Sequence, residues 1–409
     1  MIAGSPKSAP RVVEPADAGE LAAALRAAAD AGEAVLVRGG GTLLAAANPP
    51  RRCDAVIATT RLCAVHSYDP RDLTIGAGAG MTLAALAETL AQHGQFLPLD
   101  APFPARATIG GTLAAGWTGP RRSAYGRARD LLIGSTVALA DGTLAASGGM
   151  VVKNVTGYDM GKLYVGSHGT LGAFVRANFK VLPMPPARRF AVSRFDPGSR
   201  ERLDAGLHAL MVPPVALLIR DGFAALLDGD ARGDHRPEIV ALFEGSESSV
   251  ERGVRDYRST LGAAGVAETR ILDGADAAAV FQRAIDSVVA PADGQEVTLL
   301  ARGLPSEAVH RAEAARTALG ANVPVRTLAD LLTGDVVAGI AGDAGALARG
   351  VARLRDVLGR AQIVASHLPA GVEIDAWGTA PSTIGTMRAL KARFDPHGTL
   401  APGGFVGGI

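Results

Sequence analysis

The stretch Val37-Arg38-Gly39-Gly40-Gly41-Thr42 decides the fold, because three consecutive glycines follow directly on a short apolar segment, residues 34–38, that is typical of a β-strand. Without side chains, the backbone N–H groups of such a turn can converge on an anion such as a pyrophosphate. A flexible surface turn would have the same composition. On this stretch alone, both interpretations stay open.

A second cluster of small residues follows further along the chain, Thr108-Ile109-Gly110-Gly111-Thr112-Leu113-Ala114-Ala115-Gly116-Trp117. It suits a short helix that lies flat against a ligand, although close packing of a helix on a strand is the simpler explanation. Gly119-Pro120-Arg121-Arg122 comes next and places two cations beside this surface. Arg121 and Arg122 are therefore either solvated or ligands for a phosphate or carboxylate group.

The third cluster runs from Gly148 to Asp159 and leads to Gly166-Ser167-His168-Gly169-Thr170-Leu171-Gly172. Three such clusters in one half of the chain, each beside a predicted strand end, indicate a large bound ligand. Common nucleotide motifs do not explain them, since residues 76–80 lack the G-x-G-x-x-G spacing and no P-loop is present. No histidine pair has zinc-type spacing, and we expect no metal site.

Composition narrows the class of protein. A chain of 409 residues predicts two domains, and 41 basic against 40 acidic residues give no general electrostatic attraction to nucleic acid or anionic membranes. Met1 to Pro10 contain no apolar segment typical of a secretory signal, and no apolar run approaches a membrane span. Two cysteines, Cys53 and Cys63, cannot form a disulfide framework and are expected to be small core residues. A cytoplasmic location without direct membrane insertion follows.

The proline cluster Pro183-Met184-Pro185-Pro186 is the best domain boundary. Before it, short strands alternate with short helices, and Asp17 and Glu20 predict the capped start of a helix that ends at Gly32. After it, longer strands and helices alternate with few glycine clusters, which predicts an antiparallel sheet covered by helices. We expect an α+β protein with an N-terminal domain at 1–186, a cap domain at 187–380 and a C-terminal helix and tail at 381–409.

The order of these clusters resembles the FAD-binding domain of the PCMH and vanillyl-alcohol oxidase type, which consists of two subdomains. Gly119-Pro120-Arg121-Arg122, Arg129-Asp130 and Val152-Lys153-Asn154-Val155-Thr156-Gly157-Tyr158-Asp159 are more specifically similar to the FAD-binding subunits of glycolate oxidases. The resemblance covers about residues 12–186 and returns weakly at 394–403. The cap domain follows only by analogy.

The resemblance implies that FAD lies extended between the two halves of the N-terminal domain. Gly41 stands where members with covalently bound FAD have a histidine, so non-covalent FAD is expected. Ala401 replaces an asparagine usual in the family, and residues 339–345 lack the H-x-G-D-G-N-x-H motif of catalytic 2-hydroxy-acid members. The implied cofactor-binding residues are Arg38, Gly39, Gly40, Gly41, Thr42, Thr108, Gly110, Gly111, Gly116, Gly169, Leu171 and Gly172.

The expected function is that of an FAD-binding subunit that passes electrons from glycolate or another small 2-hydroxy acid through flavin to a partner. The implied partners are a homologous catalytic flavoprotein and an iron–sulfur subunit, since two cysteines are too few for a cluster in this chain. A non-catalytic assembly subunit and a stand-alone FAD-dependent alcohol or hydroxy-acid oxidase remain alternatives. His168, Arg121 and Arg122 are the catalytic candidates, although His168 is better explained as a loop residue near the adenine than as a catalytic base.

Overall fold

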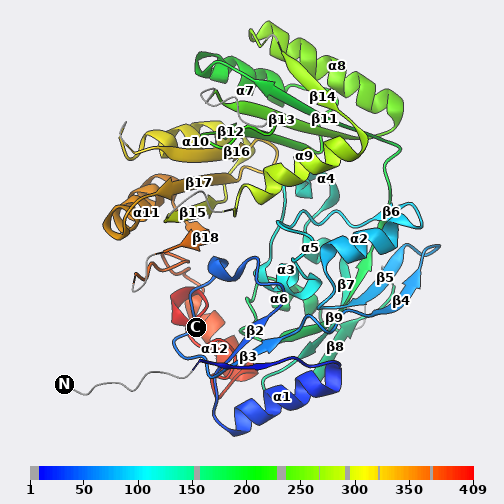
Figure 1. The fold of residues 1–409 in the computed structure, drawn as a ribbon, viewed down its shortest axis with the longest axis vertical. Helices are drawn as coiled ribbons and strands as arrows, with labels where there is room; N and C mark the ends of the chain where they lie inside the picture. The colour runs from blue at the N-terminus through cyan, green and yellow to red at the C-terminus, as the bar shows by residue number, and fades with distance from the viewer. Residues whose placement is uncertain are drawn as a thin grey trace.

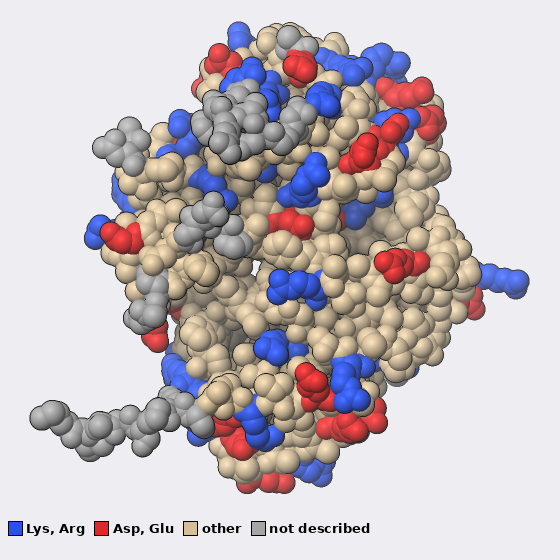
Figure 2. Space-filling view, in the orientation of Figure 1, with Lys and Arg blue, Asp and Glu red and all other residues tan. Residues whose placement is uncertain are grey.

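In this computed structural model the chain forms two α+β halves, one above the other in Figure 1. The structure describes residues 9–151, 157–227, 236–266, 268–290, 295–320, 323–368 and 372–409. The lower half holds a three-stranded and a five-stranded sheet, and the upper half holds a single eight-stranded sheet. The predicted α+β class is confirmed. Lys, Arg, Asp and Glu side chains of both signs are scattered over the face shown in Figure 2.

The first subdomain is a small parallel sheet with the strand order β1-β3-β2. The side chain of Asp17 accepts a hydrogen bond from the N–H of Glu20 and so starts helix α1, as the sequence predicted. Leu400 from the C-terminal tail forms a parallel bridge to Val35, so the tail returns to this sheet. The elements are β1 (Arg11–Val13), α1 (Ala18–Asp30), β2 (Val35–Arg38), η1 (Leu44–Ala46) and β3 (Ala55–Ala58).

The second subdomain is an antiparallel sheet with the order β4-β5-β9-β7-β8. Short helices pack against this sheet, and β7 and β8 are joined by a tight turn at Asp141 and Gly142, a residue pair typical of hairpins. The strands are β4 (Val65–Asp69), β5 (Thr74–Gly78), β7 (Leu132–Ala138), β8 (Leu144–Gly148) and β9 (Ala173–Lys180). The helices are α2 (Leu83–Ala91), α3 (Ile109–Ala115), α4 (Arg122–Tyr125), α5 (Ala128–Leu131) and α6 (Gly161–Tyr164), and β6 (Gln95–Phe96) pairs with β10 (Leu182–Pro183).

The cap is one antiparallel sheet with the order β14-β11-β13-β12-β16-β17-β15-β18. Four helices pack their apolar faces on one side of it, and α9 packs on the other side, toward the lower half. The strands are β11 (Ala187–Arg194), β12 (Ala216–Asp221), β13 (Glu238–Gly245), β14 (Thr269–Leu272), β15 (Glu296–Ala301), β16 (Val325–Asp330), β17 (Val336–Ala341) and β18 (Ala361–His367). The helices are α7 (Arg200–His208), α8 (Glu247–Ala263), α9 (Gly274–Asp286), α10 (Ala308–Thr317) and α11 (Ala344–Leu358).

The sequence predicts cap helices at residues 200–211, 249–261, 275–289, 306–319 and 346–358, and cap strands at 190–194, 215–219, 238–243, 297–301 and 336–340. All five helices are confirmed, and the five strands are confirmed out of eight in the described part of the cap. The missed strands, β14, β16 and β18, carry polar residues within short segments, which hides their alternation. Strand β11 begins directly after the proline cluster, and helix α12 (Ile384–Phe394) precedes the C-terminal tail. We retain the limits 1–186, 187–380 and 381–409 as our proposal for the domains.

The expectation that both cysteines belong to the core was wrong. Cys53 is half-buried and Cys63 is exposed, and each comes just before a strand. Strands β3 and β4 begin two residues later, at Ala55 and Val65. Among the helices that the structure describes, none combines the length and the apolar character needed to cross a bilayer.

Two neighbouring arginines tie the lower half to the cap. The guanidinium of Arg121 lies 2.7 Å from a carboxylate oxygen of Asp100 in its own domain and 3.3 Å from Glu244 in strand β13. Arg122 lies 2.6 Å from Asp335, in the turn between β16 and β17. These ion pairs have little exposure to solvent, so losing one partner would leave a charge buried and unpaired.

Asp330, at the end of β16, is buried close to this contact. Burial raises the pKa of its carboxyl from 3.8 to about 7, although hydrogen bonds from residues 332 and 333 and the charge of Arg122 oppose this rise. The folded state therefore keeps a proton that the unfolded state releases above about pH 4. The contribution of Asp330 to stability is fully present below pH 4 and is lost as the pH rises toward 7.

We therefore expect the free energy of unfolding to contain a component that falls between about pH 4 and pH 7, and Asp330→Asn should remove it. Urea denaturation at several pH values measures this component. Asp356→Asn, at an exposed position of α11, is the matched control and should keep the wild-type pH dependence. An unchanged pH dependence in Asp330→Asn would contradict the assignment.

Candidate cofactor site

The glycine loop after β2 lies directly against the start of helix α3. A Cβ atom on Gly39 would come within 2.1 Å of the Thr108 hydroxyl oxygen, and one on Gly40 would come within 1.7 Å of the Arg106 carbonyl oxygen. Both distances are far below any permitted contact, so these two positions require glycine. The first two glycine clusters of the sequence therefore touch each other through their backbones.

The same loop presents backbone donors that the protein itself does not use. Gly41 has a φ of +74°, in the left-handed region that favours glycine. Within the described residues, the N–H groups of Gly40, Gly41 and Thr42 donate to no protein acceptor. Polar backbone groups in folded proteins are almost always paired, so three adjacent free donors in a half-buried loop indicate a place for an anion.

Helix α3 forms the facing wall. The Thr108 hydroxyl accepts a hydrogen bond from the N–H of Gly111 at 3.2 Å and caps the helix. Gly116 ends the helix with a φ of +62°, and a Cβ there would lie 2.9 Å from the Cα of Gly166. The segment 166–168 runs beside this end, where the N–H of His168 donates to the carbonyl of Ala114.

These segments enclose a cavity of about 420 Å³, which we call the loop cavity. It is bounded by the glycine loop, α3, His168, the end of β18 and the C-terminal tail. The predicted cofactor-binding residues that line it are Arg38, Gly39, Gly40, Gly41, Thr42, Thr108 and Gly111. Lining residues that the sequence did not single out include Leu43, Asn48, Ser366, Leu368 and Gly404.

The other five predicted cofactor-binding residues do not line the loop cavity. A Cβ on Gly110 would come within 2.8 Å of Ala79, and one on Gly172 would come within 2.4 Å of Val137, so both glycines allow close packing. Leu171 is buried in the core of the second subdomain. Contact of these residues with a cofactor stays a prediction, as it does for Gly116 and Gly169.

His168 lies in the cavity wall in a strained conformation with a φ of +51°. Its ring packs against Trp377, with ring centroids 4.8 Å apart, and against Phe405 at 5.9 Å. Burial lowers the pKa of the imidazole to about 4, so the ring is neutral near pH 7. His168 can exchange hydrogen bonds with a ligand, but it does not bring a positive charge.

Asn48 joins three distant segments at this end of the cavity. Its side chain accepts a hydrogen bond from the N–H of Ala376 at 2.6 Å and donates to Asp375 at 2.7 Å. Its own N–H donates to the carbonyl of Gly404, which also accepts from the indole of Trp377. No local pattern marks these residues in the sequence, because their partners are more than 300 residues away along the chain.

Arg121 and Arg122 do not line the loop cavity. Both are held by carboxylates at the contact between the domains, and Arg121 also lies over the rings of Phe96, Tyr125 and Phe281. Burial alone would lower the pKa of Arg121, but Asp100 and Glu244 raise it above its ordinary value. This geometry does not support the prediction that Arg121 and Arg122 bind a phosphate or a substrate carboxylate.

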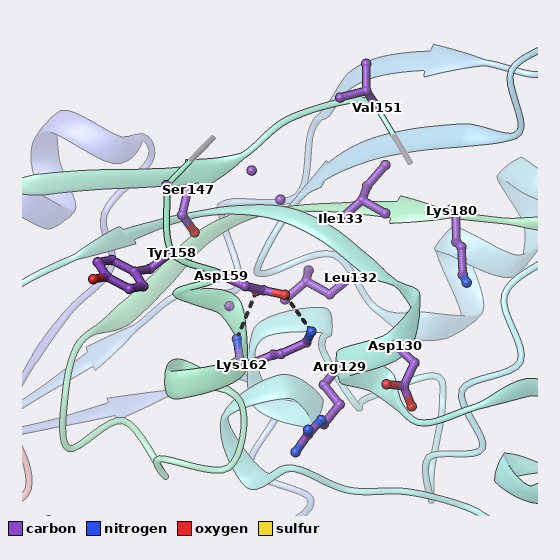
Figure 3. A pocket seen from close by; sticks show the side chains of 14 residues that line it. Arg129, Asp130, Leu132, Ile133, Ser147, Val151, Tyr158, Asp159, Lys162 and Lys180 are labelled. Atoms are coloured by element: carbon purple, nitrogen blue, oxygen red, sulfur yellow. Dashed lines mark hydrogen bonds and ion pairs between the residues drawn. The ribbon is translucent and has the colours of Figure 1, made fainter. Parts of the chain in front are cut away.

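Part of the third motif, Val152-Lys153-Asn154-Val155-Thr156, lies outside the described residues. The flanking residues border a separate cavity of about 280 Å³ (Figure 3). There Lys162 pairs with Asp159 at 3.0 Å, and Arg129 and Lys180 add two further cations. In the described parts of the chain, no group of three or more His, Cys, Asp or Glu side chains could hold a metal ion.

Comparison with known families and proteins accounts for the free donors of the glycine loop. Residues 9–148 match the family described as FAD binding domain. This part of the chain is an FAD-binding domain. It contains the glycine loop, helix α3 and most of the second subdomain, as the resemblance in the sequence implied.

Three similar proteins act on related compounds according to their names. The chain is 42% identical over 124 residues to glycolate oxidase subunit GlcE of Escherichia coli, 29% over 185 residues to glycolate oxidase subunit GlcD of Bacillus subtilis, and 33% over 172 residues to a D-lactate dehydrogenase of Archaeoglobus fulgidus. These matches cover 30%, 45% and 42% of this chain. They span 35%, 39% and 38% of the relatives, well under half of their length.

Solved structures share the whole fold. An alkyldihydroxyacetonephosphate synthase superposes on 96% of this chain and 75% of its own, with a TM-score of 0.67 and 16% identity. A chitooligosaccharide oxidase superposes on 95% of this chain and 89% of its own, with a TM-score of 0.67 and 14% identity. At such low identity the likeness extends to the fold alone, and it includes both the lower half and the cap.

The residues present fit FAD. Its diphosphate carries negative charge, which three free N–H groups and the guanidinium of Arg38 can meet in the loop cavity. Arg38 makes no ion pair with any described residue, so its charge is available. Gly41 offers no side chain for a covalent bond to the flavin. The cofactor of this domain is therefore FAD, and we propose that it is held without a covalent bond.

Gly40→Ala should abolish FAD retention, because the added methyl group would collide with the Arg106 carbonyl and displace the loop donors. The ratio of flavin to protein after gel filtration measures this. Gly262→Ala is the control, since a Cβ there meets no atom within 4 Å in helix α8. Full flavin content in folded Gly40→Ala would show that the loop does not bind the cofactor.

Arg38→Met should weaken FAD binding by about tenfold or more, the cost of one charge-assisted hydrogen bond of about 1.5–3 kcal/mol. Fluorescence titration of the apoprotein with FAD gives the Kd. Arg71→Met removes an exposed arginine near the β4–β5 turn and should leave the Kd unchanged. Equal Kd values for Arg38→Met and wild type would remove Arg38 from the site.

Proposed function

We propose that the chain is the FAD-binding subunit of an oxidoreductase that acts on the CH–OH group of a small 2-hydroxy acid, within a complex of the glycolate oxidase kind. The observation that carries this proposal is the loop cavity, in which three unused backbone donors and Arg38 face a site within an FAD-binding domain. The names of similar proteins support the substrate class, since they are glycolate oxidase subunits and a D-lactate dehydrogenase.

Bound FAD supplies a two-electron acceptor for the oxidation of an alcohol to a carbonyl group. The loop N–H groups and Arg38 would bind its diphosphate. His168, neutral near pH 7, would donate or accept one hydrogen bond in the cavity without adding charge. The rings of Trp377 and Phe405 pack against it and make this end of the cavity apolar.

A second cavity of about 250 Å³ adjoins the loop cavity and shares Gly41, Thr42 and Ser366 with it. On the cap side it is lined by Glu296 and Thr298 of β15 and by the end of β18. We place the substrate here, which we call the cap cavity, because the hydroxyls of Thr298 and Ser366 can bind a small hydroxy acid beside the cofactor loop.

A second candidate function is a non-catalytic assembly subunit, and the charges of the cap favour it. Among the described residues that line the cap cavity there is no lysine or arginine to hold a substrate carboxylate. The nearby Arg326 is paired with Glu296, and Arg220 is paired with Glu238. Oxidation would then need a homologous flavoprotein, with electrons leaving through an iron–sulfur subunit in the cytoplasm.

The proposal is tested by the visible spectrum of the purified chain, with glycolate or D-lactate added without air. We expect flavin absorption bands, and we expect them to bleach on substrate addition in the assembled complex. Bleaching of the isolated chain would identify a catalytic subunit, and bleaching only with a partner would favour the assembly role. A chain that is colourless and cannot be reloaded with FAD would overturn the proposal of an FAD-binding subunit and leave only the assembly role.

A further inference from the structure

Another cavity, of about 450 Å³, lies between the two domains and shares no described lining residue with the loop cavity or the cap cavity. We call it the interdomain groove. Helix α2 and residues 95–104 form its lower wall, and helix α9 with strand β13 forms its upper wall (Figure 1). Its apolar lining consists of Leu83, Ala84, Leu86, Ala87, Ala91, Phe96, Leu97, Leu99, Pro104, Met184, Leu242, Ala278 and Phe281.

Two aromatic side chains, one from each domain, line the groove. Phe96 comes from the lower domain and Phe281 from α9 of the cap, and the guanidinium carbon of Arg121 lies 5.6 Å from the centroid of each ring. A cavity of this size at a domain boundary, with apolar and aromatic walls and few polar groups, is typical of a site for a small organic molecule. Its walls favour an apolar, ring-shaped ligand.

Acidic side chains outnumber basic ones in the groove. Arg121 and Arg188 line its inner end, where they meet Asp100 and the fully buried Glu244. Glu244 lies 2.6 Å from Arg188 and also accepts a hydrogen bond from the Tyr125 hydroxyl. Glu88 also lines the groove, so two cations face three carboxylates, and an anionic ligand would add a further uncompensated charge in a poorly hydrated place.

Arg188 offers the groove a hydrogen-bond donor that no described residue of the protein uses. Arg188 donates to Glu244 from Nε and Nη2, while its Nη1 donates to no protein atom in the described part of the chain. The Arg188 side chain is 26% exposed, so a ligand can reach it. The amide groups of Gln95 and Gln282 already donate to backbone carbonyls. The polar complement of this groove is therefore an acceptor oxygen on a neutral molecule.

We propose that the interdomain groove binds a neutral, apolar ring compound through a carbonyl oxygen, a molecule of the quinone class, with Arg188 as the donor. The groove lies beside the cofactor site, so a ligand bound there is relevant to redox chemistry. The indole of Trp117 donates to the carbonyl of Asp100, which lines the groove, and Trp117 follows α3, whose Ala114 and Ala115 line the loop cavity. The binding itself does not depend on the proposed function. Only its relevance to redox chemistry rests on that function.

Isothermal titration calorimetry of the FAD-loaded chain with duroquinone tests the proposal. The ring positions of this quinone are fully substituted, so it cannot add to the exposed Cys63. We expect saturable binding, and weaker or no binding of 2,3,5,6-tetramethylbenzoate, which has the same ring with an anionic group. Stronger binding of the carboxylate, or no binding of the quinone, would overturn the proposal.

Ala278→Trp should weaken duroquinone binding by at least about tenfold, because the new side chain fills the groove from an exposed position of α9. Ala279→Trp, at the next exposed position outside the groove, is the matched control and should bind like wild type. Arg188→Met should also weaken binding. Unchanged affinity in Ala278→Trp would place the ligand elsewhere. FAD content, measured in parallel, separates a failure of the groove from a failure of the proposed function.

Discussion

The backbone contact between the glycine loop and the start of helix α3 is the constraint on which the rest of the structure depends. Gly39 meets the Thr108 side chain and Gly40 meets the Arg106 carbonyl at distances that no other residue allows. This contact closes the two subdomains on each other and leaves the N–H groups of residues 40–42 pointing to no protein acceptor. A site for an anionic cofactor is thus built from backbone, before any side chain takes part.

The same contact fixes what lies on either side of it. Helix α3 continues from Thr108 to Gly116, where it meets the segment that carries His168. Beyond α3 the chain passes Trp117 and reaches Arg121, which is held by Asp100 and by Glu244 of the cap. The position of the cap is therefore coupled to the wall of the cofactor site through the short segment from Gly116 to Arg121. The buried ion pairs make this coupling specific, because a displaced charge would be left buried without its partners.

The arginines near the cavities differ in whether they are paired with a carboxylate. The arginines that face the cap sheet and the domain contact are neutralised by glutamate or aspartate, whereas Arg38 keeps its charge beside the glycine loop. The loop cavity therefore suits a diphosphate, and the other cavities between the domains suit small molecules held by hydrogen bonds and apolar contact. This distribution agrees with a subunit that holds FAD and depends on a partner for part of its chemistry.

The sequence by itself determined the FAD-binding domain, the α+β class and most helices of the cap. Glycine runs, helix caps and apolar periodicity are local signals, and each is decided by a few neighbouring residues. Only the tertiary structure decided which partners the side chains contact. Arg121 and Arg122 became links between domains, and His168 met Trp377 and Phe405, because burial and pairing depend on residues that lie far along the chain. Gly110 and Gly172 show the same limit, since the sequence alone cannot separate a glycine that faces a ligand from one that permits close packing.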